Sequence, residues 1–153
     1  MKSLLEVYKT LEILPFGRIV FSKLVCFKAP YFSNIRPRFE ALSPGYCQIR
    51  IKKRRAVTNH IKSIHAIAMC NMAELAGGSM VEASIPKHMR WIPKGMAVSY
   101  LKIAKTDLTA VCELSPDLLE IPGECAVTVF VKDLNGEIVF KAEIAMYLSL
   151  KKP

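Results

Sequence analysis

Apolar residues in the N-terminal part of the chain recur every three or four positions, the spacing typical of amphipathic helices. They are Leu4, Leu5, Tyr8 and Leu11, and then Ile19, Val20, Leu24 and Phe27. Pro15 lies between the two groups, so the pattern predicts two short helices. Two interpretations of these helices are possible: they form a basic surface that lies on a membrane, or they form a helical lid packed on the domain. The small number of Lys and Arg favours the lid.

The next segment changes from an aperiodic connector to a strand. Residues 29–45 contain Pro30, Pro37, Pro44 and Gly45 without a clear hydrophobic period, which predicts a connector. Residues 46–52 then alternate between polar and apolar at every step, with Cys47, Ile49 and Ile51 on one face. This alternation predicts a β-strand.

Residues 65–83 are apolar on nearly every side, as in a helix surrounded by protein. Glu74 is the only acid in the interior of this segment, and we expect it to be buried. A close approach of a sheet to the helix backbone is favoured by small residues, which are Ala66, Ala73, Ala76, Gly77 and Gly78.

After a loop over residues 86–95, four alternating stretches predict antiparallel strands at 96–104, 108–114, 125–134 and 137–150. Asn135-Gly136 predicts a two-residue hairpin turn with positive φ at both positions, and Lys105-Thr106-Asp107 predicts a weaker turn between the first two strands. One long central helix wrapped by an antiparallel meander is an α+β fold. We expect an N-terminal helical extension and connector over 1–45, packed on a domain over 46–153 as a single globular unit.

The composition agrees with one domain that needs no metal or disulfide to fold. The chain has 153 residues, of which 52% are hydrophobic, enough for a sizeable core. Charged residues interrupt every apolar stretch before about 18 residues, so no transmembrane segment is expected. The start, Met1-Lys2-Ser3-Leu4-Leu5-Glu6, is a poor secretory signal, and we expect a cytoplasmic protein.

Charge and cysteine content restrict the chemistry only in part. The 22 basic and 13 acidic residues give a net charge of +9, which favours an anionic partner without choosing one. The five cysteines lack the short spacing of a zinc site, and the three histidines form no ligand set, so no metal is expected. The basic run over residues 50–55 is compatible with nucleic-acid binding or with a solvated face of a strand. No interleaved aromatic residue supports base stacking, and we expect no nucleic-acid partner.

The segment leading into the apolar helix carries a resemblance to a known family. Asn59, His65 six residues later, the small residue Ala66 and the acid Glu74 resemble the pattern of PaaI-like acyl-CoA thioesterases with the hotdog fold, in a largely uncharacterised branch. The resemblance covers most of residues 46–150. It implies a long central helix wrapped by a curled antiparallel sheet, and hydrolysis of an acyl-CoA or acyl-carrier-protein thioester with no cofactor beyond the coenzyme A of the substrate.

The resemblance also implies roles for individual residues. The backbone N–H of Ala66, at the start of the helix, would stabilise the oxyanion. Glu74 would attack the carbonyl or activate a water, Asn59 would position the thioester, and His65 would orient the loop. We expect the neighbouring Arg54 and Arg55 to bind the phosphates of coenzyme A or an acidic carrier protein.

Helix geometry adds a requirement for a second subunit. Nine helical residues place His65 and Glu74 about 180° apart and separated by about 13 Å, so they cannot meet within one helix. A catalytic site therefore requires a homodimer or a dimer of dimers, with contacts expected through the last strand and the central helix.

The sequence departs from the family pattern at Ala66, Ile67 and Lys62, where glycines are common. Ile67 narrows the approach of the acyl group. This departure favours the alternative of a non-catalytic, regulatory acyl-CoA-binding hotdog protein, with a dehydratase as a third candidate.

Overall fold

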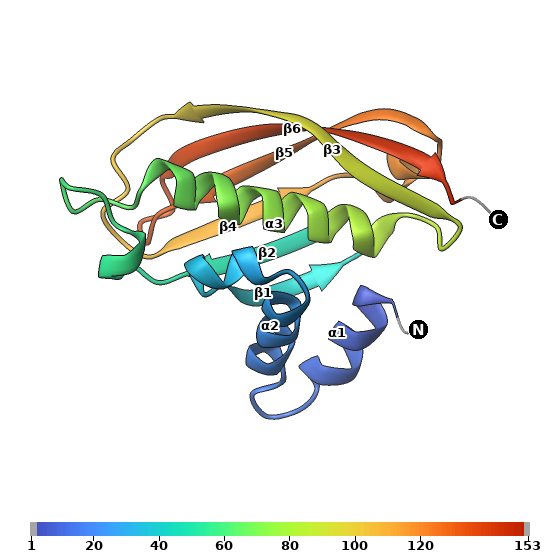
Figure 1. The fold of residues 1–153 in the computed structure, drawn as a ribbon, viewed down its shortest axis with the longest axis horizontal. Helices are drawn as coiled ribbons and strands as arrows, with labels where there is room; N and C mark the ends of the chain where they lie inside the picture. Colours follow the sequence, from blue (N-terminus) through green and yellow to red (C-terminus); the bar gives the residue numbers. More distant parts are fainter. Residues whose placement is uncertain (1–2, 152–153) are drawn as a thin grey trace.

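In the computed structural model, residues 3–151 form an antiparallel sheet curled around one long helix. The α-helices are α1 (Leu4–Glu12), α2 (Gly17–Lys28) and α3 (Ala66–Ser84). The strands are β1 (Arg38–Ser43), β2 (Tyr46–Ile51), β3 (Met89–Tyr100), β4 (Leu108–Glu113), β5 (Gly123–Lys132) and β6 (Ile138–Leu150). Short 3-10 helices are η1 (Pro30–Ile35), η2 (Arg55–Val57) and η3 (Pro116–Leu119). The strand order is β1-β2-β4-β5-β6-β3 (Figure 1).

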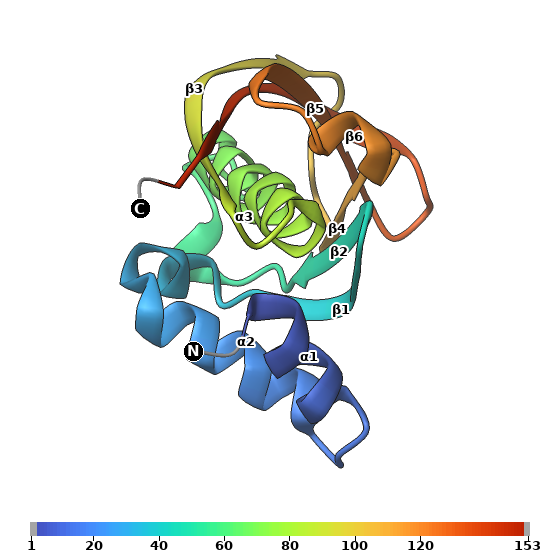
Figure 2. The ribbon, with the colours of Figure 1, turned by 90° about the vertical axis from the view of Figure 1, so that its right-hand side faces the viewer.

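The helix α3 lies inside the curl of the sheet, as the view along its axis shows (Figure 2). Its 19 residues include 13 buried ones, so the apolar pattern correctly predicted a helix enclosed by protein. Two glycines permit this close contact. A Cβ on Gly77 would lie 3.0 Å from Ile144 Cδ1, and a Cβ on Gly78 would lie 2.6 Å from Cη2 of Trp91.

The hairpin of α1 and α2 packs against the β1 edge of the sheet, beneath α3 in Figure 2. Tyr8, Phe21 and Phe39 form a chain of edge-to-face ring contacts, with centroids 5.0 and 4.9 Å apart. The backbone N–H of Phe39 donates to Ser22 Oγ at 2.9 Å, so a helix side chain occupies part of this edge. The α1–α2 hairpin thus packs on the β1 side of the domain. Within residues 3–151, no helix has the length and apolar character needed to cross a membrane.

Two strands differ from the sequence prediction, and β-bulges explain both differences. The predicted connector contains β1, so the sheet begins before residue 46, and the predicted loop over 86–95 contains the first half of β3. Register shifts occur between Phe39 and Ala41 in β1 and between Pro93 and Gly95 in β3. Each bulge breaks the two-residue alternation on which the prediction relied.

The connections between strands correct the predicted meander. β3 pairs only with β6, at the edge of the sheet, so the Lys105–Asp107 segment is not a hairpin turn between β3 and β4. The β5–β6 hairpin is confirmed, but only Gly136 has positive φ. The N–H of Gly136 donates to the carbonyl of Asp133 at 3.1 Å, and the N–H of Asp133 donates to the carbonyl of Glu137, so the turn is longer than two residues.

The β3 strand is the long open edge of the sheet. It has 12 residues, most of them exposed, and its only strand partner in the described chain is β6. The predicted contact element β6 lies between β5 and β3, so both of its edges are already paired. A second subunit can therefore extend this sheet through β3 but not through β6.

We expect Gly77→Val to lower the free energy of unfolding by about 2 to 3 kcal/mol, because the added methyl groups overpack the contact with Ile144, Val127 and Val129. Urea denaturation measures this change. Gly95→Val is the control, since a Cβ at Gly95 meets nothing within 4 Å. Equal stability of the two variants would contradict the proposed close packing.

Candidate functional site

The first turn of α3 has one backbone donor left free. His65 caps the helix, because its Nδ1 accepts from the N–H of Ile67 at 3.1 Å. The N–H groups of Ala68 and Met69 donate to the His65 carbonyl at 3.0 and 3.3 Å. Among residues 3–151 the N–H of Ala66 finds no acceptor. An unpaired N–H at the positive end of a helix can bind an anion or an oxyanion.

The loop before α3 is braced by the side chain of Asn59. Its Oδ1 accepts from the N–H groups of Ile61 and Ser63, both at 3.1 Å, and its Nδ2 donates to Ser63 Oγ at 2.8 Å. These bonds use Oδ1 and one of the two hydrogens of Nδ2, so Asn59 supports the loop. Lys62 in the same loop has φ of +61°, the conformation for which glycine is the favoured residue.

Two pockets flank the first turn of α3. One has a volume of about 310 Å³ and is lined by Asn59, Ala66 and Met69 together with Tyr100 and the chain after β3. The other has a volume of about 260 Å³ and lies on the η1 side. The free N–H of Ala66 and the predicted residue Asn59 thus meet at the first pocket.

The second pocket contains a polar atom that sequence reasoning missed. Asn71 is only 7% exposed, and its Oδ1 has no hydrogen-bond partner. It lines the 260 Å³ pocket together with His65 and Ile67. A buried acceptor without a partner costs stability unless a ligand donates to it. The only signal in the sequence was a polar residue within an otherwise apolar helix.

Glu74 is exposed on α3, which corrects the expectation that it is buried. It lies eight residues, or about 12 Å, beyond Ala66 along the helix. At 100° per residue it is about 20° from the direction of Ile67, which is 56% exposed. Ile67 and Glu74 therefore share an exposed strip of α3 that neither the sheet nor the N-terminal segments cover. Glu74 does not reach Ala66 of its own chain.

The two predicted phosphate-binding arginines differ in their surroundings. The Arg54 guanidinium donates to the backbone carbonyl of Asn34 in η1, whereas Arg55 is exposed at the start of η2. Burial lowers the pKa of Arg54, and repulsion from the nearby Arg36 lowers it further. Both arginines lie on the chain that leads to Asn59, but neither is in the lining of the pocket beside Ala66.

The cysteines offer no activated thiol in the core. Cys47 and Cys112 are buried and face each other across β2 and β4 as free thiols. Burial raises the pKa of the Cys112 thiol to about 12, and it also raises that of Cys47. These thiols are protonated at neutral pH. In residues 3–151 no three His, Cys, Asp or Glu side chains gather as a metal site.

Comparisons with known proteins identify the relatives of this fold. A family model described as "Domain of unknown function (DUF4442)" matches residues 17–148. A crystal structure described only as a genomics target is 42% identical, with a TM-score of 0.86, and the match covers 97% of this chain and 99% of the other. A search of curated proteins returned no match.

Two more distant structures share the hotdog fold. A Pseudomonas aeruginosa protein described as a "Probable Thioesterase" has a TM-score of 0.79 at 24% identity, covering 90% of this chain and 97% of that one. A thioesterase family protein from Silicibacter pomeroyi has a TM-score of 0.73 at 13% identity, covering 90% and 100%. These likenesses confirm the expected hotdog architecture.

We expect Lys62→Gly to raise the free energy of unfolding by about 0.5 to 1 kcal/mol, because relief of the left-handed strain exceeds the added entropy of the unfolded glycine. Lys62→Ala is the matched control, since alanine removes the same side chain but keeps the strain. Urea denaturation distinguishes them. Stabilisation by alanine equal to that by glycine would show that the conformation of residue 62 is not the cause.

Proposed function

The chain belongs to the DUF4442 family, and from this premise we propose that it is a thioesterase acting on acyl-CoA or acyl-carrier-protein substrates. The descriptions of several structural neighbours as thioesterases support the reaction class. Coenzyme A or the carrier enters as part of the substrate, and no other cofactor takes part.

The free N–H of Ala66 is the observation that carries the proposal. It lies at the N-terminus of a 19-residue helix and beside a 310 Å³ pocket. A thioester carbonyl bound there would place its oxygen at this donor. The N–H and the helix dipole favour the negative charge that develops on that oxygen in the tetrahedral intermediate.

Glu74 of a partner subunit supplies the base. Its exposed position on the open strip of α3 is the position that a partner can approach. Antiparallel pairing of two β3 edges would bring two α3 helices together with opposite directions, so that each Glu74 approaches the helix start of the other subunit. The active unit is therefore a homodimer, or a pair of such dimers.

The reaction then needs only these groups and one water. The carboxylate of Glu74 accepts a proton from water, and the oxygen attacks the thioester carbon to form an oxyanion at Ala66 N–H. When the oxyanion collapses, the carbon–sulfur bond breaks and the thiolate leaves. Glu74 returns the proton to the sulfur, which yields a free acid and a thiol.

The remaining residues position the substrate. Asn59 and His65 act as positioning residues, because their side chains hold the loop and cap the helix. The unpaired Oδ1 of Asn71 is suited to accept from an amide N–H of the pantetheine arm. Arg54 and Arg55 bind the phosphates, and Ile67 limits the entry of the acyl group.

A non-catalytic acyl-CoA-binding protein is the second candidate. Ala66 and Ile67 stand where the family commonly has two glycines, and the exposed Ile67 side chain lies next to the donor N–H. Such a protein would bind acyl-CoA with the same residues but release no thiol.

We expect Ala66→Pro to lower the rate of thiol release by about 10²- to 10³-fold, because it removes the proposed oxyanion donor. The fold accommodates this change. Proline is favoured at the first position of a helix. His65, the residue before it, is extended with φ of −65° and ψ of 139°, which is the conformation that a residue before proline prefers.

The measurement is thiol release from a panel of acyl-CoA substrates, with the melting temperature as the check on folding. Ala66→Gly keeps the N–H and is the matched control, which should retain most of the activity. Full activity in a folded Ala66→Pro protein would remove Ala66 from the mechanism.

We expect Glu74→Gln to abolish thiol release while acyl-CoA binding and the oligomeric state remain unchanged, because the amide cannot accept a proton. Glu82→Gln, on the same helix, is the control, since Glu82 accepts from Trp91 Nε1 at 2.7 Å and is outside the proposed site. Unchanged turnover in Glu74→Gln would contradict the role of Glu74. Binding without thiol release by the wild-type protein would favour the second candidate.

A further inference from the structure

The chain between Glu12 and Glu40 combines exposed apolar side chains with cations and contains no acid. Its five basic residues are Arg18, Lys23, Lys28, Arg36 and Arg38. Phe16 and Phe27 are 78% and 88% exposed, and Ile13 at the α1–α2 turn is 80% exposed. Side chains this apolar and this exposed indicate a surface that contacts another partner.

The exposed apolar residues of α2 lie on its outer face. Val20, Leu24 and Phe27 fall within about 60° of one another at 100° per residue. Phe16 is the exposed residue that precedes the helix. The opposite side of the helix buries Phe21 and Ser22 against the sheet. The hairpin therefore has one apolar face that packs on the domain core and a second one that stays largely exposed in the described chain.

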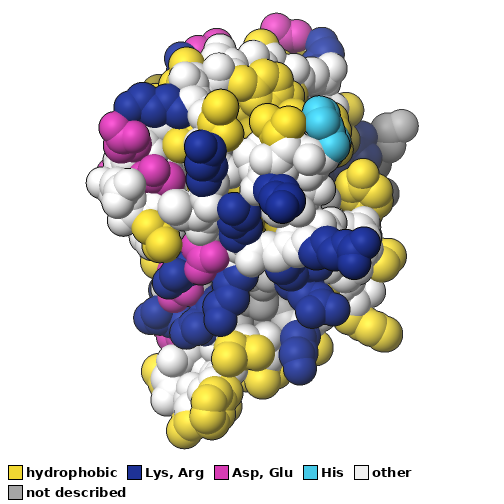
Figure 3. Space-filling model, turned by 90° about the vertical axis from the view of Figure 1, so that its left-hand side faces the viewer, with side chains coloured by type: hydrophobic (Ala, Val, Ile, Leu, Met, Phe, Trp, Pro, Cys, Tyr) yellow, Lys and Arg dark blue, Asp and Glu magenta, His cyan; other side chains and the backbone are white. Residues whose placement is uncertain are grey.

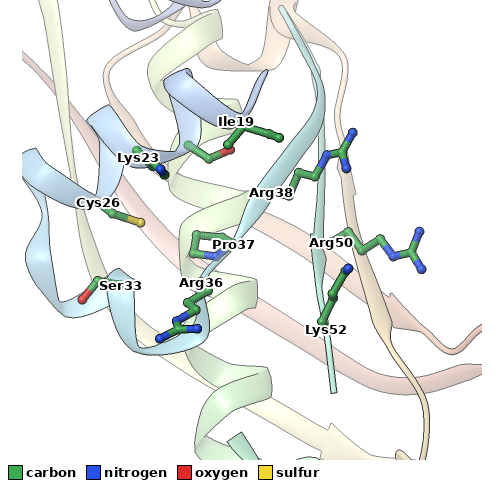
Figure 4. Close-up of a pocket in the computed structure, with 10 residues that line it drawn as sticks. Ile19, Lys23, Cys26, Ser33, Arg36, Pro37, Arg38, Arg50 and Lys52 are labelled. Atoms are coloured by element: carbon green, nitrogen blue, oxygen red, sulfur yellow. The ribbon is translucent and has the colours of Figure 1, made fainter. Parts of the chain in front are cut away.

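A cation-lined pocket lies on one flank of this outer face. Its volume is about 690 Å³, and its lining residues come from α2, from η1 and the segment after it, and from β1 and β2 (Figure 4). Lys23 of α2, Lys52 of β2 and Arg36 after η1 line it, and none of these three has a carboxylate partner in residues 3–151. No acidic residue is in the lining of this pocket. Its apolar part is formed by Ile19, Cys26 and Pro37.

The two other cations in the lining of this pocket are partly neutralised. Arg38 and Arg50 are opposite each other in the β1–β2 ladder, and they pair with Glu40 at 3.3 Å and Asp107 at 3.0 Å. Their guanidinium groups point away from α2 in Figure 4. Figure 3 shows the Lys and Arg side chains gathered across this face of the molecule, with hydrophobic side chains at its lower tip.

We propose that the outer face of α2 and the α1–α2 turn dock on an anionic phospholipid surface, with lipid phosphates bound in the pocket of Lys23, Arg36 and Lys52. Apolar side chains beside a cationic surface match the headgroup and acyl layers of such a membrane. A second copy of the chain is disfavoured as the occupant, because two faces that each carry an excess of cations would repel each other. The proposal does not depend on thioesterase activity.

The test is co-sedimentation with vesicles of phosphatidylcholine alone or with 30% phosphatidylglycerol. We expect at least tenfold tighter binding to the vesicles that contain phosphatidylglycerol, and weaker binding as the salt concentration rises. Phe16→Ser combined with Phe27→Ser should weaken this binding at least tenfold. Lys23→Gln combined with Lys52→Gln should remove the preference for phosphatidylglycerol.

The matched control is Leu118→Ser combined with Ile121→Ser, at exposed apolar residues near η3, which should leave vesicle binding unchanged. Equal binding to both vesicles, or none, would overturn the proposal. So would vesicle-independent self-association that the Phe16 and Phe27 substitutions abolish, because the face would then be a subunit contact. Binding of soluble glycerol phosphate without vesicle binding would assign the pocket to a free phosphate ligand instead.

Discussion

The close contact between α3 and the sheet determines which groups of the domain remain available. Gly77 lets the strands approach the helix backbone, and Gly78 lets the ring of Trp91 in β3 pack directly on it. The sheet, together with α1, η1 and η3, then covers α3 except along one strip. Any chemistry that uses this helix is therefore restricted to that strip and to the helix N-terminus. Glu74 lies on the strip, and the free N–H of Ala66 lies at the N-terminus.

The sequence predicted the elements whose pattern is local and regular. The limits of α3 follow from an apolar run that starts after the capping His65 and ends at Ser84, and the structure agrees with the prediction within one residue. The β1 strand was not predictable in this way. Its bulge between Phe39 and Ala41 interrupts the alternation, and prolines lie on both sides of it. The place of β3 beside β6 depends on pairing between distant residues, which no local pattern encodes.

The candidate site was predictable only where a residue acts through its own segment. His65 as a helix cap follows from its position before an apolar helix, and its bond to the Ile67 N–H agrees with that role. The exposure of Glu74 was not predictable, because it depends on how far the sheet curls around the helix. The unpaired Oδ1 of Asn71 depends in the same way on which side chains surround it.

The two edges of the sheet have different surroundings. This difference makes catalysis between subunits compatible with docking of α2 on a membrane. At the β1 edge, the N–H of Phe39 is bound by Ser22 and the α1–α2 hairpin packs alongside. The β3 edge has no such cover within the described chain. A subunit that joins through β3 would therefore leave the outer face of α2 free. Lipid contact on one side and catalysis between subunits on the other can occur in the same assembly, because they use opposite edges of one sheet.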